Sequence, residues 1–437
     1  MRTVVVLASA LLGSASAHAD DAPPVRTLLA NPGQLASWLS DRDPVIESAR
    51  DRLVAAEATG DQTHVLPNPQ LQASAGGFVL GATTPSTPMM LSLSQTTNYQ
   101  IGVGELVELG KRGPRQTAAD LRTREAGETA VGALGARLGD ATAALGRLAY
   151  DAAKRDVVAA NVSAAKQVEQ LEKARLDRKD LSESEYARIE LDTEELELQL
   201  GRAEAELQSA LATCSATLYA RCSAAGLDAR SLDAAAPLPE QLPAPDQAIA
   251  NRPVRAASRL EAQALGWDAT LADRRKIPDP TIGAAYLLDN LTIAGNQHEQ
   301  LIFSLALPLP LFDRGNHDAA AARANAHAVE AQDRADIAQA LGTVDALLAQ
   351  RDTLEKTLHK LEVEEVPKST QIVDQTRTAF DLGQARLADL LLAERQHRDL
   401  LLEVLDTRYD LFNVRAQLRQ ALGFDDDVAR TAGGRTR

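Results

Sequence analysis

The sequence predicts a mainly α-helical chain built from two copies of one unit, in which a β-hairpin leads into a very long helix that turns back on itself. Three observations carry this prediction. Motifs marked by proline and glycine recur at a nearly constant offset along the 437 residues. Leu and Ala recur at helical spacing over long stretches, and aromatic residues make up only 3% of the chain. Long helical assemblies pack Leu and Ala in stripes, whereas a globule of this size usually builds its core around aromatic residues.

The duplication rests on three landmarks that occur once in each half, in the same order. They are Asp43-Pro44-Val45 and Arg252-Pro253-Val254, Pro67-Asn68-Pro69 and Pro278-Asp279-Pro280, and Gly110-Lys111-Arg112-Gly113 and Phe312-Asp313-Arg314-Gly315. The offsets are 209, 211 and 202 positions, measured between the first prolines, the last prolines of the second landmark and the final glycines. Similarity at so constant a period indicates an internal repeat.

Each copy contains a predicted β-hairpin, at about residues 68–109 in the first copy and about 280–312 in the second. A connector rich in Thr, Pro and Ser, residues 82–88, divides the first hairpin. In the second hairpin apolar residues alternate, which is typical of strands with one apolar face. These residues are Ile282, Ala284, Tyr286 and Leu288, and then Phe303, Leu305, Leu307 and Leu309. Two hairpins give four strands, which are too few to close a barrel unless several subunits pool their strands.

Long helices follow both hairpins. Apolar residues recur in steps of four and three from Leu134 to Ala152, which is the pattern of a coiled-coil seam. Another seam runs from Tyr186 to Ala210, and a second stripe of Leu191, Leu198 and Ala205 lies beside it. Two seams on one helix indicate neighbours on two sides, as in a closed ring of helices. At 1.5 Å per residue each long helix would reach roughly 100 Å.

The landmarks also give the predicted boundaries. Residues 1–19 form a signal peptide, 20–213 the first copy, 214–250 a linker or equatorial segment, 251–423 the second copy, and 424–437 a flexible C-terminal tail. Within the copies, a short helix precedes each hairpin, the long helices span about 114–178 and 316–382, and the return helices span about 182–213 and 386–422.

The first 19 residues have the three parts of a secretory signal. Arg2 supplies a positive charge, residues 4–12 form a short apolar run, and residues 17–19 form a small-x-small cleavage site before Asp20. No later stretch approaches the ~20 apolar residues that a transmembrane helix needs. We therefore expect an exported protein that is either soluble outside the cytoplasm or crosses an outer membrane as a β-barrel.

Composition argues against several classes of function. The net charge of −15 argues against nucleic-acid binding. The seven histidines are scattered, and no catalytic constellation, phosphate-binding loop or metal-binding tract occurs, so we expect neither an enzyme nor a cofactor nor a bound metal. Cys214 and Cys222 could form a disulfide in an oxidising compartment, whereas two cysteines alone lack the further ligands that zinc prefers.

Three motifs, taken with the duplicated layout, resemble a known family. They are Val107-Glu108-Leu109-Gly110-Lys111-Arg112, the stretch Leu307–Gly315, and Gly383-x-x-Arg386-Leu387-x-Asp389-Leu390-Leu391. In this order and spacing the chain resembles the TolC-like outer-membrane efflux channels over about residues 36–423. The Glu-Leu-Gly-Lys-Arg form looks most like the outer-membrane subunit of heavy-metal efflux systems of the cobalt–zinc–cadmium type.

The resemblance implies an architecture and partners. It implies a homotrimer in the outer-membrane lipid, with a twelve-stranded barrel to which each chain gives four strands, continued by a long periplasmic α-helical coiled-coil barrel. A periplasmic adaptor (a membrane fusion protein) would dock at the helical tips, and an inner-membrane pump of the resistance–nodulation–division class would supply the energy. The chain would then be a passive export duct, for heavy-metal cations in the narrower match.

The resemblance also implies roles for residues near the helical turns. Asp389 would line the periplasmic entrance, where three copies would form a ring of negative charge that attracts cations; the alternative is an ordinary solvated helix carboxylate. Asp381, Arg386 and Phe380 would lie beside it, and Phe380 lacks the hydroxyl that a tyrosine would offer to a neighbouring helix. The expected adaptor-docking residues are Lys179, Leu181, Ser182, Gly383, Leu387 and Ala388. Pro367, inside the second long helix, is expected to bend it and act as a hinge.

Two other functions remain open at this point. A secreted coiled-coil scaffold or adhesion protein would share the helices without needing strands that have an apolar outer face, and the low aromatic content suits it. Within the channel interpretation, export of drugs or other organic molecules competes with export of metals.

Overall fold

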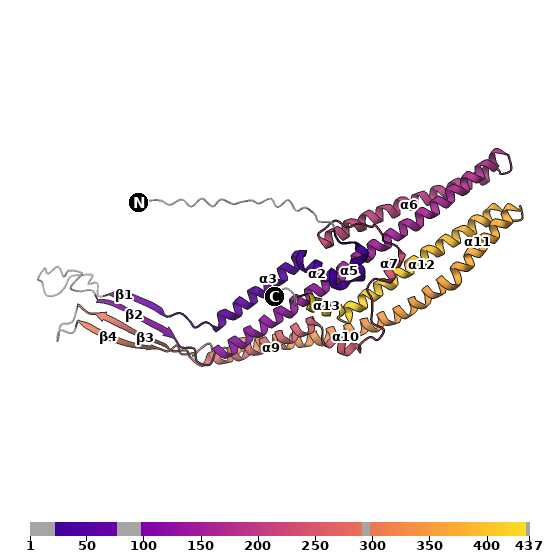
Figure 1. Cartoon of the computed structure of the whole chain (residues 1–437). Helices are drawn as coiled ribbons and strands as arrows, with labels where there is room; N and C mark the ends of the chain where they lie inside the picture. The colour runs from indigo at the N-terminus through magenta and orange to yellow at the C-terminus, as the bar shows by residue number, and fades with distance from the viewer. Residues whose placement is uncertain (1–21, 77–97, 291–297, 434–437) are drawn as a thin grey trace, which may run out of the picture. The chain divides into compact units, whose positions relative to one another are not determined.

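The computed structural model describes residues 22–76, 98–290 and 298–433, so the expected signal peptide and the connector at 82–88 lie outside the described residues. The chain divides into two units, whose elements Figure 1 labels. The helical unit comprises Met1–Glu47, Val131–Ala250 and Ala340–Arg437, and the strand unit comprises Ser48–Ala130 and Asn251–Gln339. Each unit thus combines segments from both halves of the sequence.

The strand unit contains one antiparallel sheet in the order β1-β2-β3-β4 (Figure 1). Its strands are β1 (Gln70–Gly76), β2 (Asn98–Leu106), β3 (Thr281–Leu288) and β4 (Glu299–Ala306). The first two strands form one hairpin and the last two form the other. The hairpins join through β2 and β3, where Gly102 pairs with Ala285 and Leu106 with Thr281.

Helices lead into and out of this sheet. They are α3 (Pro44–His64) and α5 (Arg112–Asp177) around the first hairpin, and α9 (Pro253–Asp273), the short 3-10 helix Arg274–Lys276 and α10 (Asn316–Lys360) around the second. Within the strand unit, the Arg255 guanidinium contacts both carboxylate oxygens of Asp333 at 3.1 Å, which joins α9 to α10. The Thr123 hydroxyl donates to the carbonyl of Ala56 and joins α5 to α3.

The helical unit continues α5 and α10 and adds the return helices. The longer additions are α6 (Glu183–Leu218), α11 (Val366–Asp381) and α12 (Leu387–Ala421), and the short ones are α1 (Val25–Ala30), α2 (Pro32–Arg42), α7 (Ala229–Asp233), α8 (Pro245–Ala250) and α13 (Phe424–Gly433). The predicted seam from Leu134 to Ala152 is buried in the core of this unit, together with Leu207 of α6 and Phe412 of α12. The predicted mainly α fold with a small sheet is confirmed. None of the described helices is both long and apolar enough to cross a membrane.

Because Gly146 of α5 has no side chain, the ring of Phe412 can pack against the backbone of this helix. A Cβ at position 146 would overlap the ring of Phe412, which is fully buried. We expect Gly146→Ala to lower the free energy of unfolding by about 1–3 kcal/mol, the usual cost of overpacking, although alanine favours the helix. Thermal unfolding followed by circular dichroism measures the change.

Gly201→Ala is the matched control for this substitution. It also lies inside a long helix, but a Cβ there would meet no atom within 4 Å. Its higher helix propensity should then raise stability by roughly 1 kcal/mol. An unchanged unfolding midpoint for Gly146→Ala would contradict the packing argument.

The segment between the two halves is held by a disulfide and a side-chain hydrogen bond. Cys214 and Cys222 are bonded, with their Cα atoms 6.0 Å apart, and close the end of α6. Tyr219 lies between them in the left-handed region that terminates the helix. The indole nitrogen of Trp38 donates to the carbonyl of Leu218 at 3.1 Å, which ties α2 to the same turn.

The C-terminal segment differs from the sequence-based prediction. Residues from 424 onward were expected to form a flexible tail, but Phe424–Gly433 form α13. The buried Arg419 explains the difference, because its guanidinium pairs with Asp425 at 2.9 Å and donates to the carbonyl of Pro237 at 2.6 Å. A buried arginine needs such partners, and Asp425 is fixed at the start of the helix by supplying one.

Candidate functional site: helical tips and sheet faces

The turn between α5 and α6 forms the first helical tip. Lys179 has a positive φ of 68°, and the amide of Asp180 donates to the carbonyl of Arg175 at 2.9 Å. Ser182 then caps α6 in a capping box with Glu185. The hydrogen bonds from Ser182 hold the pKa of the Glu185 carboxyl below its usual value. Lys179 and Ser182 are exposed and Leu181 is half-buried, so the tip presents mainly polar groups.

The turn between α11 and α12 forms the second tip. Gly383 has a φ of 71°, a conformation that glycine adopts without strain, and its amide donates to the carbonyl of Phe380 at 2.9 Å. Asp389 occupies the third position of α12, where its carboxylate accepts from the amide of Arg386 at 3.2 Å. Asp381, Gly383, Arg386, Ala388 and Asp389 are all exposed in the chain.

An apolar cluster packs the two tips against each other. Its buried members are Ile189, Phe380, Leu387 and Leu390. Phe380 is 7% exposed and lies under the guanidinium of Arg175, whose central carbon is 4.8 Å from the ring centroid. This contact is a cation–π interaction. Leu387 is 4% exposed, so the structure does not present it for docking in the way that the sequence-based hypothesis assumed.

Charged side chains join α12 to the helices of the first tip. The guanidinium of Arg398 contacts both carboxylate oxygens of Asp192 at 3.1 Å, and this pair is mostly buried. On the first tip, Arg175 also donates to the nearly buried Glu172 at 3.2 Å. Arg175 therefore connects a carboxylate of its own helix to the aromatic ring of the second tip.

Pro367 lies just after a change in helix geometry. Residues Leu361–Glu365 form a π-helical turn, and α11 begins at Val366. Proline has no amide hydrogen to donate to the preceding turn, and π turns relieve such breaks. Glu362 of the π turn accepts from Arg408 of α12 at 2.6 Å. The hinge predicted at Pro367 thus coincides with an irregular turn that is tied to its neighbour.

Pro367→Ala should restore a regular helix through this turn. We expect a stiffer second long helix and, in the channel that the resemblance implies, a lower open fraction, because alanine supplies the missing amide donor. Single-channel conductance in planar bilayers measures this fraction. Lys368→Ala, at the next exposed position, is the control; conductance and export equal to the unsubstituted chain for Pro367→Ala would contradict the hinge.

The sheet has two chemically different faces. On one face most of the large side chains are apolar and exposed, and the cross-strand register places them side by side, with Glu105 and Glu299 at its two ends. They are Leu71, Tyr99, Ile101, Val103, Ile282, Tyr286, Leu301, Phe303 and Leu305. The opposite face is polar or small over most of its area, with Gln72, Ser74, Gln100, Gly102, Gly104, Gly283 and Ser304. A soluble sheet would cover such an apolar face, so its exposure marks a surface that water does not face in the working protein.

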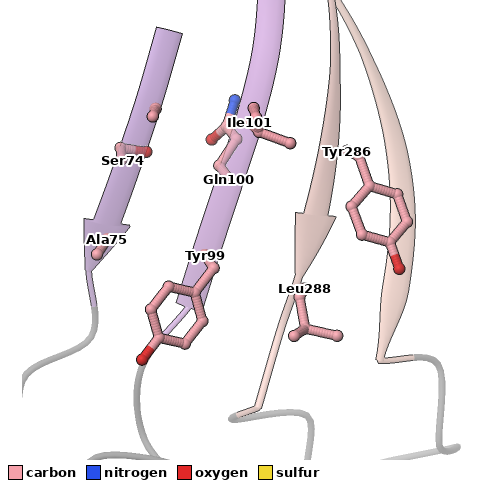
Figure 2. A pocket seen from close by; sticks show the side chains of 8 residues that line it. Ser74, Ala75, Tyr99, Gln100, Ile101, Tyr286 and Leu288 are labelled. Atoms are coloured by element: carbon pink, nitrogen blue, oxygen red, sulfur yellow. The ribbon is translucent and has the colours of Figure 1, made fainter.

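An open hollow lies on the sheet near the ends of its strands. Figure 2 shows the side chains that line it, which include Tyr99, Ile101, Tyr286 and Leu288. All four belong to the apolar face. The lining offers no titratable cluster, and among the described residues no group of three or more His, Cys, Asp or Glu side chains could hold a metal ion.

Comparisons with known proteins agree on one kind of protein. Residues 244–424 match the family model described as outer membrane efflux protein. The solved structure of CusC is 16% identical, with a TM-score of 0.76, and the match covers 92% of this chain and 94% of that one. The Campylobacter jejuni CmeC outer membrane channel is 14% identical over 90% of this chain and 86% of that one, with a TM-score of 0.72. The Vibrio cholerae outer membrane protein VceC is 19% identical over 90% of this chain and 96% of that one, with a TM-score of 0.71. No curated protein sequence matches.

Residues 244–424 thus match the efflux-protein family, and the solved structures show that the chain shares the fold of these outer-membrane channels. Both comparisons agree with the resemblance predicted from the motifs, and the matched family is one of transport channels. The apolar sheet face and the helical tips are the two surfaces on which a channel function would depend.

Sequence reasoning missed part of the second tip. It singled out Phe380 for the hydroxyl it lacks, whereas the structure shows the ring buried under Arg175. It also missed Asp192 and Arg398. The signal in the sequence was weak. An aromatic residue next to a tip, in a chain with six Phe, indicates packing, but residue spacing does not predict a partner as distant in the sequence as Arg175.

Proposed function

We propose that three copies of this chain form a passive outer-membrane export duct of a tripartite efflux system. The observation that carries the proposal is the sheet with one exposed apolar face and one polar or small face. Lipid can cover the first face and a water-filled lumen the second, which is the alternation that membrane barrels require. Four strands do not close a barrel, whereas three copies would supply twelve.

The helical tips are the proposed docking end. An adaptor would contact the exposed residues of both turns, namely Lys179, Ser182, Gly383 and Ala388, with Leu181 at the margin. Leu387 would act indirectly, by packing beneath the turn. An inner-membrane pump of the resistance–nodulation–division class would drive export through the adaptor, because the duct itself offers no energy source.

Heavy-metal cations are the proposed cargo. The support is the Glu-Leu-Gly-Lys-Arg motif at residues 108–112 and the exposed Asp389 near the second tip. Three such carboxylates around an entrance would favour cations over anions. Asp381, exposed at the same turn, would add to this negative potential, and Arg386 would oppose part of it.

Deletion of the gene tests both duct and cargo. We expect heightened sensitivity to zinc, cobalt or cadmium, restored by the unsubstituted chain and less well by Asp389→Asn. Sensitivity to antibiotics with unchanged metal tolerance would favour organic export instead. Recovery of the protein as a soluble monomer, absent from the outer-membrane fraction, would favour the coiled-coil scaffold and overturn the duct.

A further inference from the structure

Residues 307–314, which we call the junction segment, connect β4 to α10 and expose large apolar side chains. Leu307, Leu309 and Leu311 are all exposed, and the side chain of Phe312 is completely exposed, at 101%. Apolar residues gathered in this way form a patch that a water-facing loop would not maintain. Something other than water therefore covers this patch in the working protein.

The junction segment continues the apolar face of the sheet. Along β4 that face holds every second residue, and the alternation continues through Leu307, Leu309 and Leu311 after the strand ends. The end of β2 behaves in the same way, because Val107 and Leu109 follow it and are exposed. The face proposed to contact lipid thus extends from the paired strands toward the helices.

Glu105 marks the depth at which this extension begins. It pairs with Ile282, which in turn pairs with Leu305, so the three residues form one row across the apolar face. A charged side chain on the outer face of a barrel is costly in the hydrocarbon core and becomes tolerable near the membrane surface. The junction segment lies on the helix side of this row, which places it at the depth of the lipid headgroups. Since the proposed duct directs its helices into the periplasm, these are the headgroups of the periplasmic leaflet.

The backbone of the junction segment suits surroundings that are poor in water. Pro308 and Pro310 have no amide hydrogen, and the amide of Leu311 donates to the carbonyl of Leu309 at 2.9 Å. These three positions therefore leave no amide hydrogen that water would have to satisfy. This lowers the cost of placing the segment among lipids.

Two basic side chains without carboxylate partners flank the exposed apolar residues. Lys276 precedes β3 and Arg314 ends the junction segment, and both are exposed. Neither forms an ion pair with another described residue, whereas the neighbouring Lys111 ammonium is held by Asp279 at 2.7 Å. The carboxylate of Asp313, beside Arg314, accepts from a backbone amide. Lys276 and Arg314 can therefore bind an external anion.

We propose that the junction segment binds the headgroup layer of the periplasmic leaflet, with Phe312 inserted beside the acyl chains and with Arg314 and Lys276 bound to the phosphate of an anionic phospholipid. This inference rests on the proposed duct. Apolar side chains next to basic ones are typical of segments that lie in the membrane interface. The planar guanidinium of Arg314 can donate two hydrogen bonds to one phosphate, and the Lys276 ammonium adds a point charge.

Spin labelling tests the depth of Phe312 in the full chain. Cys214 and Cys222 are bonded to each other, so a nitroxide reagent reacts only with a new thiol. In bilayers that contain phosphatidylglycerol, we expect the label on Phe312→Cys to collide more often with oxygen dissolved in the membrane than with a nickel chelate dissolved in water. The ratio of these two collision rates should be lower than for Phe303→Cys on the sheet and higher than for Leu382→Cys at the second tip.

Leu382 is the matched control, because its apolar side chain is also exposed but belongs to the turn before Gly383 in the helical unit. A ratio at position 312 equal to that at position 382 would show that the junction segment faces water and would overturn the inference. Exclusion of both reagents at position 312 would assign its contact to a neighbouring copy and would overturn it as well. In either case a high ratio at position 303 would leave the duct standing, whereas a ratio at position 303 as low as that at position 382 would overturn the duct itself.

Lipid affinity tests the two basic residues, by titration with a fluorescent analogue of each lipid. We expect Lys276→Gln with Arg314→Gln to weaken the binding of phosphatidylglycerol to the detergent-solubilised protein by roughly fivefold for each lost charge. The binding of phosphatidylcholine should stay unchanged. Arg178→Gln removes an exposed arginine of the first tip and should alter the binding of neither lipid. Unchanged affinity for phosphatidylglycerol in the double variant, or an equal loss for both lipids, would overturn the assignment of these residues to the headgroup.

Discussion

Phe303→Arg is expected to abolish assembly of the outer-membrane duct proposed for this chain. Phe303 is 77% exposed on the apolar face of β4, and its neighbours across the strand are apolar as well. An arginine on the lipid face of a barrel costs about 2–4 kcal/mol near the middle of the bilayer. Three copies would add this cost three times in one barrel, which exceeds what a marginally stable assembly tolerates. The amount of heat-resistant oligomer in the outer-membrane fraction, seen on denaturing gels, measures the loss of assembly.

Ser304→Arg is the matched control, because it introduces the same side chain one residue along the same strand. Ser304 points to the opposite face of the sheet, which we assign to the lumen. An arginine there should leave assembly largely intact and alter ion selectivity. Equal loss from both variants would mean general disruption of the strand, and loss from Ser304→Arg alone would reverse the assignment of the faces.

The periodic parts of this fold could be predicted from the sequence. The seam from Leu134 to Ala152 is buried as its spacing predicts, because a helix with apolar residues in steps of three and four must cover that stripe. The strands around Ile282 and Phe303 follow the same logic with a period of two. The tip glycine at 383 has the positive φ expected of a helix end.

The parts that were not predicted depend on single contacts between distant residues. Helix α13 is held by the buried Arg419, and a run of charged residues at a chain end otherwise resembles a solvated tail. The burial of Phe380 depends on Arg175 in the other half of the chain. The π turn before Pro367 is a local response to a missing amide hydrogen. A proline in the sequence predicts that the helix is irregular there, but it does not predict a π turn.

Arg175→Met is expected to open the periplasmic entrance of the proposed duct. The guanidinium over Phe380 holds the first tip to the second, and its bond to Glu172 of the same helix keeps the guanidinium in place. A cation–π contact away from bulk water is worth about 1–2 kcal/mol, and methionine keeps the apolar stem while removing the charge. Loss of about 1.4 kcal/mol per chain would shift the equilibrium between docked and released tips roughly tenfold. Mean single-channel conductance and open fraction in planar bilayers should both rise.

A double-mutant cycle separates this hold from a general weakening of the tips. Phe380→Leu removes the ring but keeps an apolar side chain in the cluster. If the contact between Arg175 and Phe380 holds the tips together, the double variant should raise the conductance by much less than the sum of the two single effects. Arg178→Ala, an exposed arginine on the same tip, should change neither conductance nor stability. Additive effects would assign the opening to loss of packing alone.

Glu172 supplies the direction of the change, because its carboxylate is 6% exposed and would be left buried without a partner once Arg175 is replaced. It gains water only if the tips separate, so the substitution favours the open entrance over a closed one with a buried charge.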